Sequence, residues 1–228
     1  PEPARAAARQ LADPATVAIL TGQQAGLFGG PLFTLLKALT ALKLAEQVAR
    51  EHHVPCVAIF WIDAEDHDWD EVRSCTVFDE TLAPRSVALP ARSGDDDAGP
   101  VATVHLDDQI TSVLDELEQI LPATEFRADI MAALRHAYRP GMGMAEAFGT
   151  WMEQVLGPRG LVVYDSSDPA AKPLDDVRVR RALNHAVDKK ELVDGVLLGY
   201  GEVIPTLVGP MYWGHDNSLQ PYAYDPNR

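Results

Sequence analysis

The chain has 228 residues and a formal net charge of −15 at pH 7, with 46% hydrophobic and 23% charged residues. This length allows one large or two small domains, and the composition is that of a globular protein rather than a disordered chain. Because carboxylates outnumber basic side chains, the charge balance argues against nucleic acids and anionic membrane surfaces as partners.

The first part of the chain has the pattern of a strand, a helix and a second strand. The apolar runs Thr16–Leu20 and Val54–Trp61 are each typical of a buried parallel strand. Between them, Leu32–Glu51 follows Pro31, a favoured first helical residue, and predicts a helix with one narrow polar stripe and a wide buried face. That predicted stripe consists of Thr34, Lys37, Thr40, Lys43, Gln47 and Arg50. The spacing predicts a βαβ unit with parallel strands.

The middle of the chain contains mainly helical patterns. Cys75–Phe78 is strand-like, and the Gly/Asp-rich segment Ala91–Pro100 predicts an exposed loop. Gly160–Tyr164 predicts a third buried strand. The helical patterns between these strands cover Ile110–Leu121, Glu125–Tyr138 and Met144–Leu156. Together they predict an α/β fold, with a partial Rossmann-like parallel sheet flanked by helices.

The composition changes near Asp176. Residues 1–176 contain 13 Lys and Arg against 28 Asp and Glu, whereas residues 177–228 contain 6 of each. Val177–Val187 predicts a short helix, and Asp188–Glu191 resembles a capping box that begins a second helix ending near Gly199. Tyr200–Arg228 predicts long loops. We therefore expect two parts, residues 1–174 and a short, mostly helical and loop segment at residues 175–228.

A glycine-rich segment, Thr21–Pro31, lies between the first strand and its helix. Such a turn exposes backbone N–H groups at the positive end of a helix, which suits a phosphate or a carboxylate. It is neither GxxxxGK[ST] nor GxGxxG, so the standard nucleotide motifs are absent. Gln23 and Gln24 can each donate and accept hydrogen bonds, and Thr34 and Lys37 lie within reach of such a ligand. A tight turn that needs glycine, with a merely solvated Lys37, explains the pattern equally well.

An acidic segment follows the second strand. It contains Asp63, Glu65, Asp66, His67, Asp68, Asp70 and Glu71. Ligands in open α/β sheets bind outside the carboxyl ends of the strands. Neighbouring carboxylates favour a protonated imidazole, which makes His67 a candidate proton donor, and Asp with His can also hold a divalent metal. The alternative is a solvated acidic loop that caps a helix.

The remaining polar groups point less clearly to chemistry. Asp165–Asp168 follows the third strand and can line the same crevice, although turn and capping chemistry explains it almost as well. Asp168 precedes Pro169 as a helix N-cap does. His105 and His136 have no matching partners and are predicted to be structural or surface residues.

The two cysteines help to predict the cellular compartment of the protein. Cys56 and Cys75 provide neither a disulfide framework nor zinc spacing, and we expect Cys56 to be a small core residue. No apolar run is long enough to span a bilayer, and no signal peptide is present. We therefore expect a cytoplasmic protein.

Several long motifs resemble one family in the order in which they occur. TGQQAGLFGGPLFTLLKALTALKLA at Thr21–Ala45 and VPCVAIFWIDAEDHDWDEV at Val54–Val72 resemble signatures of the bacillithiol biosynthesis cysteine-adding enzymes. The resemblance continues through FRADIMAALRHAYRPGMGMAEAFGTWM and GLVVYDSSDPAAKPL, and it covers about residues 10–174. Trp69 replaces the family's usual Phe, and Asp63 replaces a residue that is often small.

This resemblance implies a Rossmann core like those of class I nucleotidyl transferases and aminoacyl-tRNA synthetases. It implies a ligase that joins cysteine to glucosaminyl-malate, with ATP or another nucleotide as a possible activator and no metal assigned. Polar contacts or proton transfer would then fall to Asp66, His67 and Asp68. The implied substrate-binding residues are Gln23, Gln24, Gly26, Gly29, Gly30, Thr34, Lys37 and Trp61.

The tail resembles a different family. The segment LDDVRVRRALNHAVDKKELVDGVLLGYGEVIPTLVGPMYWGHDNSLQPYAYDP resembles an interior part of the family 5 solute-binding proteins of peptide and nickel ABC transporters. Two alternatives to the ligase therefore stay open: an extracytoplasmic peptide-binding component, and a chimeric chain without a function of its own. Cysteine-adding enzymes are more than twice as long as this chain, so a partial sheet with exposed edges predicts self-association.

Overall fold

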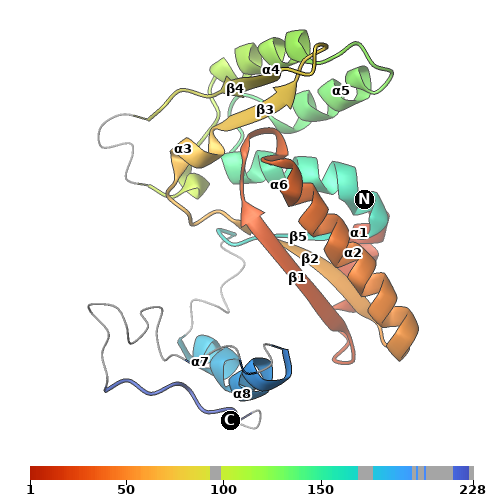
Figure 1. The fold of residues 1–228 in the computed structure, drawn as a ribbon, viewed down its shortest axis with the longest axis vertical. Coiled ribbons are helices and arrows are strands. Elements are labelled where there is room, and N and C mark those ends of the chain that lie inside the picture. The colour runs from red at the N-terminus through yellow and green to blue at the C-terminus, as the bar shows by residue number, and fades with distance from the viewer. Residues whose placement is uncertain (93–98, 169–176, 197–198, 200–202, 204–217, 226–228) are drawn as a thin grey trace. The chain divides into compact units, whose positions relative to one another are not determined.

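The computed structural model describes residues 1–92, 99–168, 177–196, 199, 203 and 218–225. The chain divides into two compact units, Pro1–Asp168 and Pro169–Arg228. Figure 1 shows that the first unit contains a parallel sheet with helices packed on it, and a separate hairpin beside further helices. The expected α/β fold with a partial Rossmann-like sheet is therefore confirmed.

The first unit contains all five described strands. Its strands are β1 (Val17–Gln24), β2 (Cys56–Asp63), β3 (Ser74–Phe78), β4 (Pro84–Ala88) and β5 (Val162–Asp165). Its α-helices are α1 (Glu2–Gln10), α2 (Leu32–His52), α3 (Trp69–Val72), α4 (Gln109–Ile120), α5 (Arg127–Ala137) and α6 (Met144–Leu156). Short 3-10 helices cover Leu27–Gly29, Val101–Thr103 and Gly157–Arg159. Sequence periodicity missed α1 and β4.

The three-stranded sheet has the order β1-β2-β5, and both pairings are parallel. β1 and β2 pair along their whole lengths, so that Gln24 and Asp63 end neighbouring strands at the same edge of the sheet. The helix α2 packs on β1 and β2, and α6 packs on β5. This strand order places the glycine-rich turn beside the acidic segment.

The first strand differs from the expectation of a short buried run. β1 continues to Gln24, so the two glutamines belong to the strand and not to a loop. Val17 and Leu20 are 39% and 59% exposed. The prediction of a fully buried strand was wrong because, within the described residues, β1 pairs on one side only and forms an edge of the sheet.

The position of α2 and most of its predicted polar stripe are confirmed, because Lys37, Thr40, Lys43, Gln47 and Arg50 are exposed, but Thr34 and the predicted wide buried face were wrong. Thr34, placed in the polar stripe, has no exposed surface, while Leu32, Phe33 and Leu36 are 71%, 47% and 53% exposed. The buried stripe is narrow and made mostly of small residues: Thr34, Ala38, Ala41, Leu42 and Ala45. Small residues let α2 approach the sheet closely, which periodicity alone does not reveal, because it ranks Leu above Ala as a core residue.

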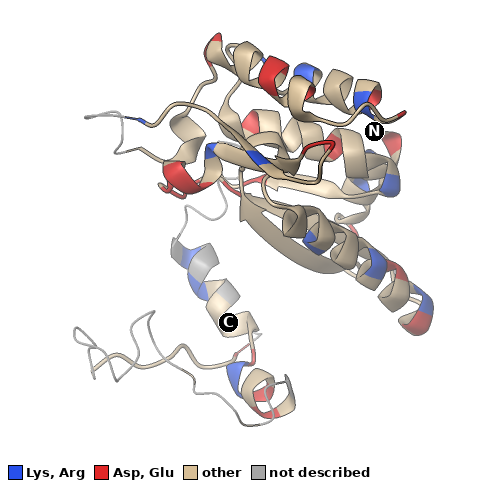
Figure 2. Ribbon diagram, turned by 45° about the horizontal axis from the view of Figure 1, so that its top comes forward, with Lys and Arg blue, Asp and Glu red and all other residues tan. Residues whose placement is uncertain are grey.

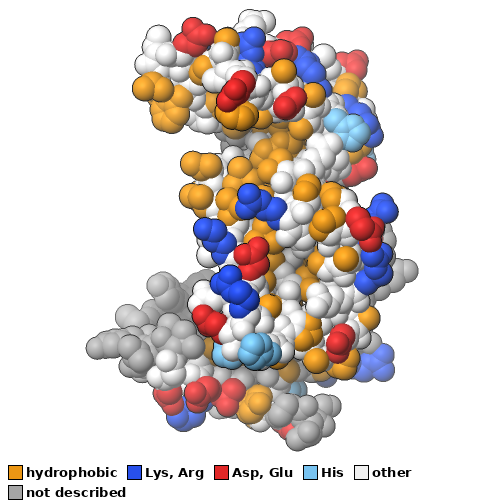
Figure 3. Space-filling view, turned by 90° about the vertical axis from the view of Figure 1, so that its right-hand side faces the viewer, with side chains coloured by type: hydrophobic (Ala, Val, Ile, Leu, Met, Phe, Trp, Pro, Cys, Tyr) orange, Lys and Arg blue, Asp and Glu red, His pale blue; other side chains and the backbone are white. Residues whose placement is uncertain are grey.

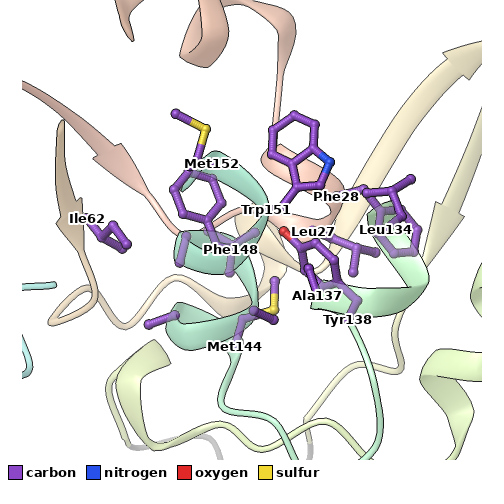
Figure 4. Close-up of a cluster of buried hydrophobic side chains, with 14 of the residues drawn as sticks. Leu27, Phe28, Ile62, Leu134, Ala137, Tyr138, Met144, Phe148, Trp151 and Met152 are labelled. Atoms are coloured by element: carbon purple, nitrogen blue, oxygen red, sulfur yellow. The ribbon is translucent and has the colours of Figure 1, made fainter. Parts of the chain in front are cut away.

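The hydrophobic core lies where α5 and α6 meet the sheet and the glycine-rich turn (Figure 4). Phe148 of α6 packs on Phe60 of β2 with their ring centroids 5.9 Å apart. Gly149 leaves room for Ile62, whose side chain would lie 3.0 Å from an added Cβ. This core packs against the sheet near the carboxyl ends of β1 and β2.

The second unit is smaller and mostly helical in its described residues. It contains α7 (Val177–Ala186), α8 (Lys189–Glu191) and a π-helical turn at Leu192–Val196. The predicted cap is confirmed, because the Asp188 carboxylate accepts a hydrogen bond from the Glu191 N–H at 3.0 Å. His185 contacts the Ala223 carbonyl at 2.7 Å. The predicted helix start at Pro169, and most of the predicted loops after Tyr200, lie outside the described residues.

Candidate active site

A chain of hydrogen bonds joins the ends of β1 and β2. Lys37 Nζ donates to Gln23 Oε1 at 3.0 Å, and Gln23 Nε2 donates to Gln24 Oε1 at 3.0 Å. Gln24 Nε2 then donates to Asp66 Oδ2 at 2.6 Å and to Glu71 Oε2 at 3.1 Å. The two amides thus connect one cation on α2 with two carboxylates of the acidic segment.

This chain has a direction, and it affects the electrostatics of Asp66. Each donor along it points toward the carboxylates, so the ionised form of Asp66 is favoured. The Gln24 amide and then the Asp68 backbone N–H lower the pKa of the Asp66 carboxyl below its ordinary value. If a ligand amine or hydroxyl takes the place of the Gln24 amide, it can donate a hydrogen bond to the ionised Asp66 carboxylate.

The turn that follows β1 is held in an uncommon backbone conformation. Phe28, Gly29 and Gly30 have φ values of 54°, 97° and 68°, in the left-handed region. A Cβ on Gly29 would lie 2.3 Å from the Trp151 ring, and one on Gly26 would lie 2.6 Å from the Gly30 Cα. The glycines therefore have a conformational and packing reason to be there, whether or not they contact a ligand.

Thr34 lies in the first turn of α2, next to this glycine-rich turn. Its side chain is fully buried, and within the described residues its Oγ1 has no hydrogen-bond partner. Buried hydroxyls normally have partners, because an unpaired one costs free energy. The predicted ligand contact thus lies beside the turn, but under the surface rather than on the polar stripe where sequence analysis placed it.

The three predicted catalytic residues have different surroundings. Asp66 contacts Gln24, as described above, while Asp68 accepts a hydrogen bond from the Glu71 N–H at 3.0 Å and so caps α3. His67 is exposed, and its imidazole makes no hydrogen bond within the described part of the chain. Figure 2 shows the acidic residues coloured red on α3 and the segment before it. The structure brings Asp66 alone of the three to the glutamines.

Two cavities share the glutamine pair as a wall. One, of about 340 Å³, lies between the glycine-rich turn and β3. The other, of about 570 Å³, is lined by the same two glutamines together with Trp61, Asp63 and Asp66. Trp61 also packs on Tyr164, with ring centroids 4.8 Å apart. These volumes suit small-molecule ligands.

Several residues of the smaller cavity were not singled out from the sequence. They are Val72, Ser74, Cys75 and Thr76, from α3 and β3, whereas Glu71, which also lines this cavity, belongs to the predicted acidic segment. Burial raises the pKa of the Cys75 thiol above its ordinary value, so the thiol stays protonated near neutral pH. The short strand-like pattern at these positions gave no signal that β3 would lie beside the turn.

The end of β5 serves mainly to fix the backbone. Ser166 Oγ accepts a hydrogen bond from the Ala64 N–H at 3.2 Å, and Asp165 Oδ1 accepts from the Ser167 N–H at 2.9 Å. Turn chemistry, one of the two readings of Asp165–Asp168, accounts for the Asp165–Ser167 contact, while the Ser166 contact joins the ends of β5 and β2. His105 and His136 are both exposed, and His105 Nδ1 lies 3.2 Å from the Thr103 carbonyl.

Within the described residues, no group of three or more His, Cys, Asp or Glu side chains is arranged to hold a metal ion. The same residues contain no helix long and apolar enough to cross a membrane. Cys56 and Cys75 are both free thiols. Cys56 is half-buried rather than fully buried, because it begins β2 at the end of the sheet away from the site.

Comparison with known proteins identifies similar chains. The family described as "Bacillithiol biosynthesis BshC, N-terminal Rossmann-like domain" matches residues 2–196. A relative from Salinibacter ruber is 37% identical over 172 residues, covering 75% of this chain and 31% of its own length. One from Symbiobacterium thermophilum is 36% identical over 192 residues, covering 79% and 34%. Both are named "Putative cysteine ligase BshC".

These matches also show how much of each protein the similarity covers. The chain spans about a third of the length of the curated relatives that it matches. The family match continues to residue 196, past the change in charge near Asp176. The matches give no support to the resemblance of residues 175–228 to solute-binding proteins.

Proposed function

This chain belongs to the bacillithiol biosynthesis BshC family, and we propose that it is the N-terminal part of a ligase that joins cysteine to glucosaminyl-malate. The observation that carries the proposal is the Lys37–Gln23–Gln24–Asp66 chain of hydrogen bonds between two cavities. It lies at the carboxyl ends of adjacent parallel strands, where open α/β sheets bind their ligands.

The two cavities suggest a division of the substrates. The smaller one adjoins Gly26, Gly30 and the amino end of α2, which favours a carboxylate or phosphate group. The larger one contains Asp63 and Asp66 beside the Trp61 ring, which favours the ammonium group of an amino acid. In this arrangement Gln23 and Gln24 would contact both substrates.

Three further roles stay predictions. His67, from its exposed position, and Asp68, at the start of α3, would make polar contacts to a ligand or transfer a proton. The amide bond between cysteine and glucosaminyl-malate needs an activated carboxyl, and ATP or another nucleotide would supply that activation. Neither GxGxxG nor GxxxxGK[ST] marks a place for such a nucleotide in this chain.

The proposal can be tested by ligand-dependent stability of the purified chain. We expect glucosaminyl-malate and cysteine each to raise the melting temperature, with a stabilisation of about 2.7 kcal/mol at a ligand concentration of 100 times Kd. Gln24→Ala and Lys37→Ala should remove the rise. Gln47→Ala replaces an exposed glutamine on the distal part of α2, where it bonds to Glu51, and serves as the control. No rise with either compound would contradict the proposal.

We further propose a cytoplasmic location and partners limited to small molecules and copies of the chain itself. The two free thiols suit a reducing compartment. The net charge of −15 disfavours nucleic acids and anionic lipid surfaces.

Self-association through β1 is the second part of this proposal. Within the described residues β1 has one pairing partner, and Leu20 is 59% exposed on it. Figure 3 shows hydrophobic side chains gathering at mid-height on one face of the first unit. Leu32, Phe33 and Leu36 of α2 add exposed apolar surface. An unpaired edge with exposed apolar side chains, and without Lys or Pro, promotes association.

Sedimentation velocity at several concentrations tests this association. Leu20→Lys places a charge on the edge strand and should shift the chain toward the monomer. Leu82→Lys is the matched control, because Leu82 is 78% exposed in the turn between β3 and β4, away from β1. Equal sedimentation of the two variants would show that β1 is not the contact.

The resemblance of the tail to solute-binding proteins stays a prediction. Residues 175–228 would be a fused fragment resembling a solute-binding protein, and the change in charge near Asp176 favours that view. The family match through residue 196 favours instead a continuation of the ligase sequence.

A further inference from the structure

The glycine-rich turn is in contact with a tyrosine more than a hundred residues further along the chain. The Tyr138 hydroxyl donates to the Gly26 carbonyl at 3.1 Å and accepts from the Gly29 N–H at 3.1 Å. The Gly29 N–H also reaches the Gly26 carbonyl at 3.1 Å. The hydroxyl therefore closes a triangle of hydrogen bonds across the turn.

Two aromatic contacts complete the enclosure of the turn. The Tyr138 ring meets the Phe28 ring edge to face, with centroids 5.2 Å apart and an interplanar angle of 80°. Trp151 of α6 packs on Gly29 closely enough to exclude a Cβ. Figure 4 shows Tyr138, which directly follows α5, and Trp151 of α6, with the Tyr138 hydroxyl directed toward the part of the turn that carries Leu27.

The turn needs such support because its backbone conformation is intrinsically unfavourable. Phe28 has a φ of 54°, which costs an L-residue about 1 kcal/mol or more, and two further left-handed residues follow it. Tyr138 has no exposed surface, and burial raises the pKa of its phenol above the ordinary value. The hydroxyl thus remains protonated near neutral pH, so that it can donate its hydrogen bond to the Gly26 carbonyl.

The turn also determines how α2 meets a ligand. Gly26 and Gly30 line the smaller cavity, together with Pro31 and Leu32 at the amino end of α2. A change in the turn would move these backbone groups relative to Gln23 and Gln24. Tyr138 does not line the cavity, and its hydroxyl reaches it only through the Gly26 carbonyl, so any effect of Tyr138 on binding is indirect.

We propose that Tyr138 is a positioning residue, which holds the Gly26–Gly30 turn in its left-handed conformation and so presents the amino end of α2 to the carboxylate of a ligand. This inference rests on the proposed function for the identity of the ligand. Its structural part, the fixing of the turn, does not depend on any ligand.

The variant that tests it is Tyr138→Phe, which keeps the ring and its packing on Phe28 and removes only the hydroxyl. Loss of one buried hydrogen-bonding group should raise the hydrogen-exchange rate of the Gly29 amide, measured by NMR, by about tenfold. It should weaken glucosaminyl-malate binding, measured by calorimetry, by a similar factor of about ten.

Met131→Ala is the control for general loss of stability. Met131 is buried on α5, two turns before Tyr138, and its truncation removes packing without removing a hydrogen bond of the turn. We expect it to lower the melting temperature while the Gly29 exchange rate and ligand binding stay at wild-type values.

Each outcome decides the inference. Unchanged exchange at Gly29 in Tyr138→Phe would overturn it, as would an equal effect of Met131→Ala on exchange. If the wild-type chain binds no glucosaminyl-malate, the proposed function fails, and the exchange of Gly29 by itself then supports or overturns the role of Tyr138.

Discussion

The glycine-rich turn and the acidic segment follow adjacent strands, yet they are stabilised in opposite ways. The turn is enclosed by Tyr138 and Trp151, and its backbone is fixed by contacts from distant helices. The acidic segment lies largely at the surface, where Asp68 satisfies a helix end and His67 is open to solvent. One half of the site is therefore preorganised by packing, whereas the other is held by local hydrogen bonds that a ligand can replace.

The largest expected effect comes from filling the enclosed turn. Gly29→Ala adds left-handed strain and a clash with the Trp151 ring, and we expect it to lower the free energy of unfolding by about 3 kcal/mol. Gly141→Ala is the matched control, because Gly141 has a similar φ of 86° but nothing within 4 Å of an added Cβ. That control should cost only about 1 kcal/mol in urea denaturation. Equal losses would show that the turn adapts, and the contrast with the acidic segment would then disappear.

A smaller effect is expected at the junction of the two regions, and it depends on pH. Gln24 lowers the folded-state pKa of Asp66 below the ordinary value of 3.8. The resulting stabilisation is complete above the unfolded-state pKa and is lost as the pH falls through the lower, folded-state pKa.

Gln24→Ala should therefore lose less stability than the wild-type chain does as the pH falls below the ordinary aspartate pKa of 3.8. Urea denaturation at a series of pH values measures this difference. Gln47→Ala, on the distal part of α2, is a control in which an exposed glutamine hydrogen-bonds to Glu51 instead. If the free energy of unfolding falls equally with pH in Gln24→Ala and in the wild-type chain, Gln24 does not lower the pKa of Asp66.

The smallest effect on stability is expected at the exposed end of the acidic segment. Because the His67 imidazole makes no hydrogen bond in the described part of the chain, His67→Ala should change the free energy of unfolding by less than about 0.5 kcal/mol. Its effect on turnover in a complete enzyme, if the proton-transfer role holds, should far exceed its effect on stability. A large loss of stability would mean that the segment is held more firmly than its exposed surface implies.

Much of this organisation could be predicted from local patterns. The apolar runs identified β1, β2 and β5, and the order of strand, helix and strand was enough to expect parallel pairing. The same order placed Gln24 and Asp66 at one edge of the sheet. The second unit was predicted less completely, and part of it lies outside the described residues.

Other features could not be predicted because they depend on what each element packs against. Thr34 and Leu36 both lie on α2, but the polar residue is buried beside the glycine-rich turn and the apolar one is exposed. Cys75 lines the smaller cavity because β3 packs beside the glycine-rich turn, a contact that no pattern in the sequence indicates. Asp66, rather than His67 or Asp68, reached Gln24 because of the path of the chain after β2.

The sequence by itself determined the family, the α/β class and the two segments that meet at the carboxyl ends of β1 and β2. These follow from periodicity and from motifs of adjacent residues. The tertiary structure alone decided that Tyr138, 109 positions after Gly29, fixes the glycine-rich turn, and that the glutamine pair lines two cavities. Contacts over such separations depend on strand order and on the close packing of α5 and α6 against the turn, which no local pattern encodes.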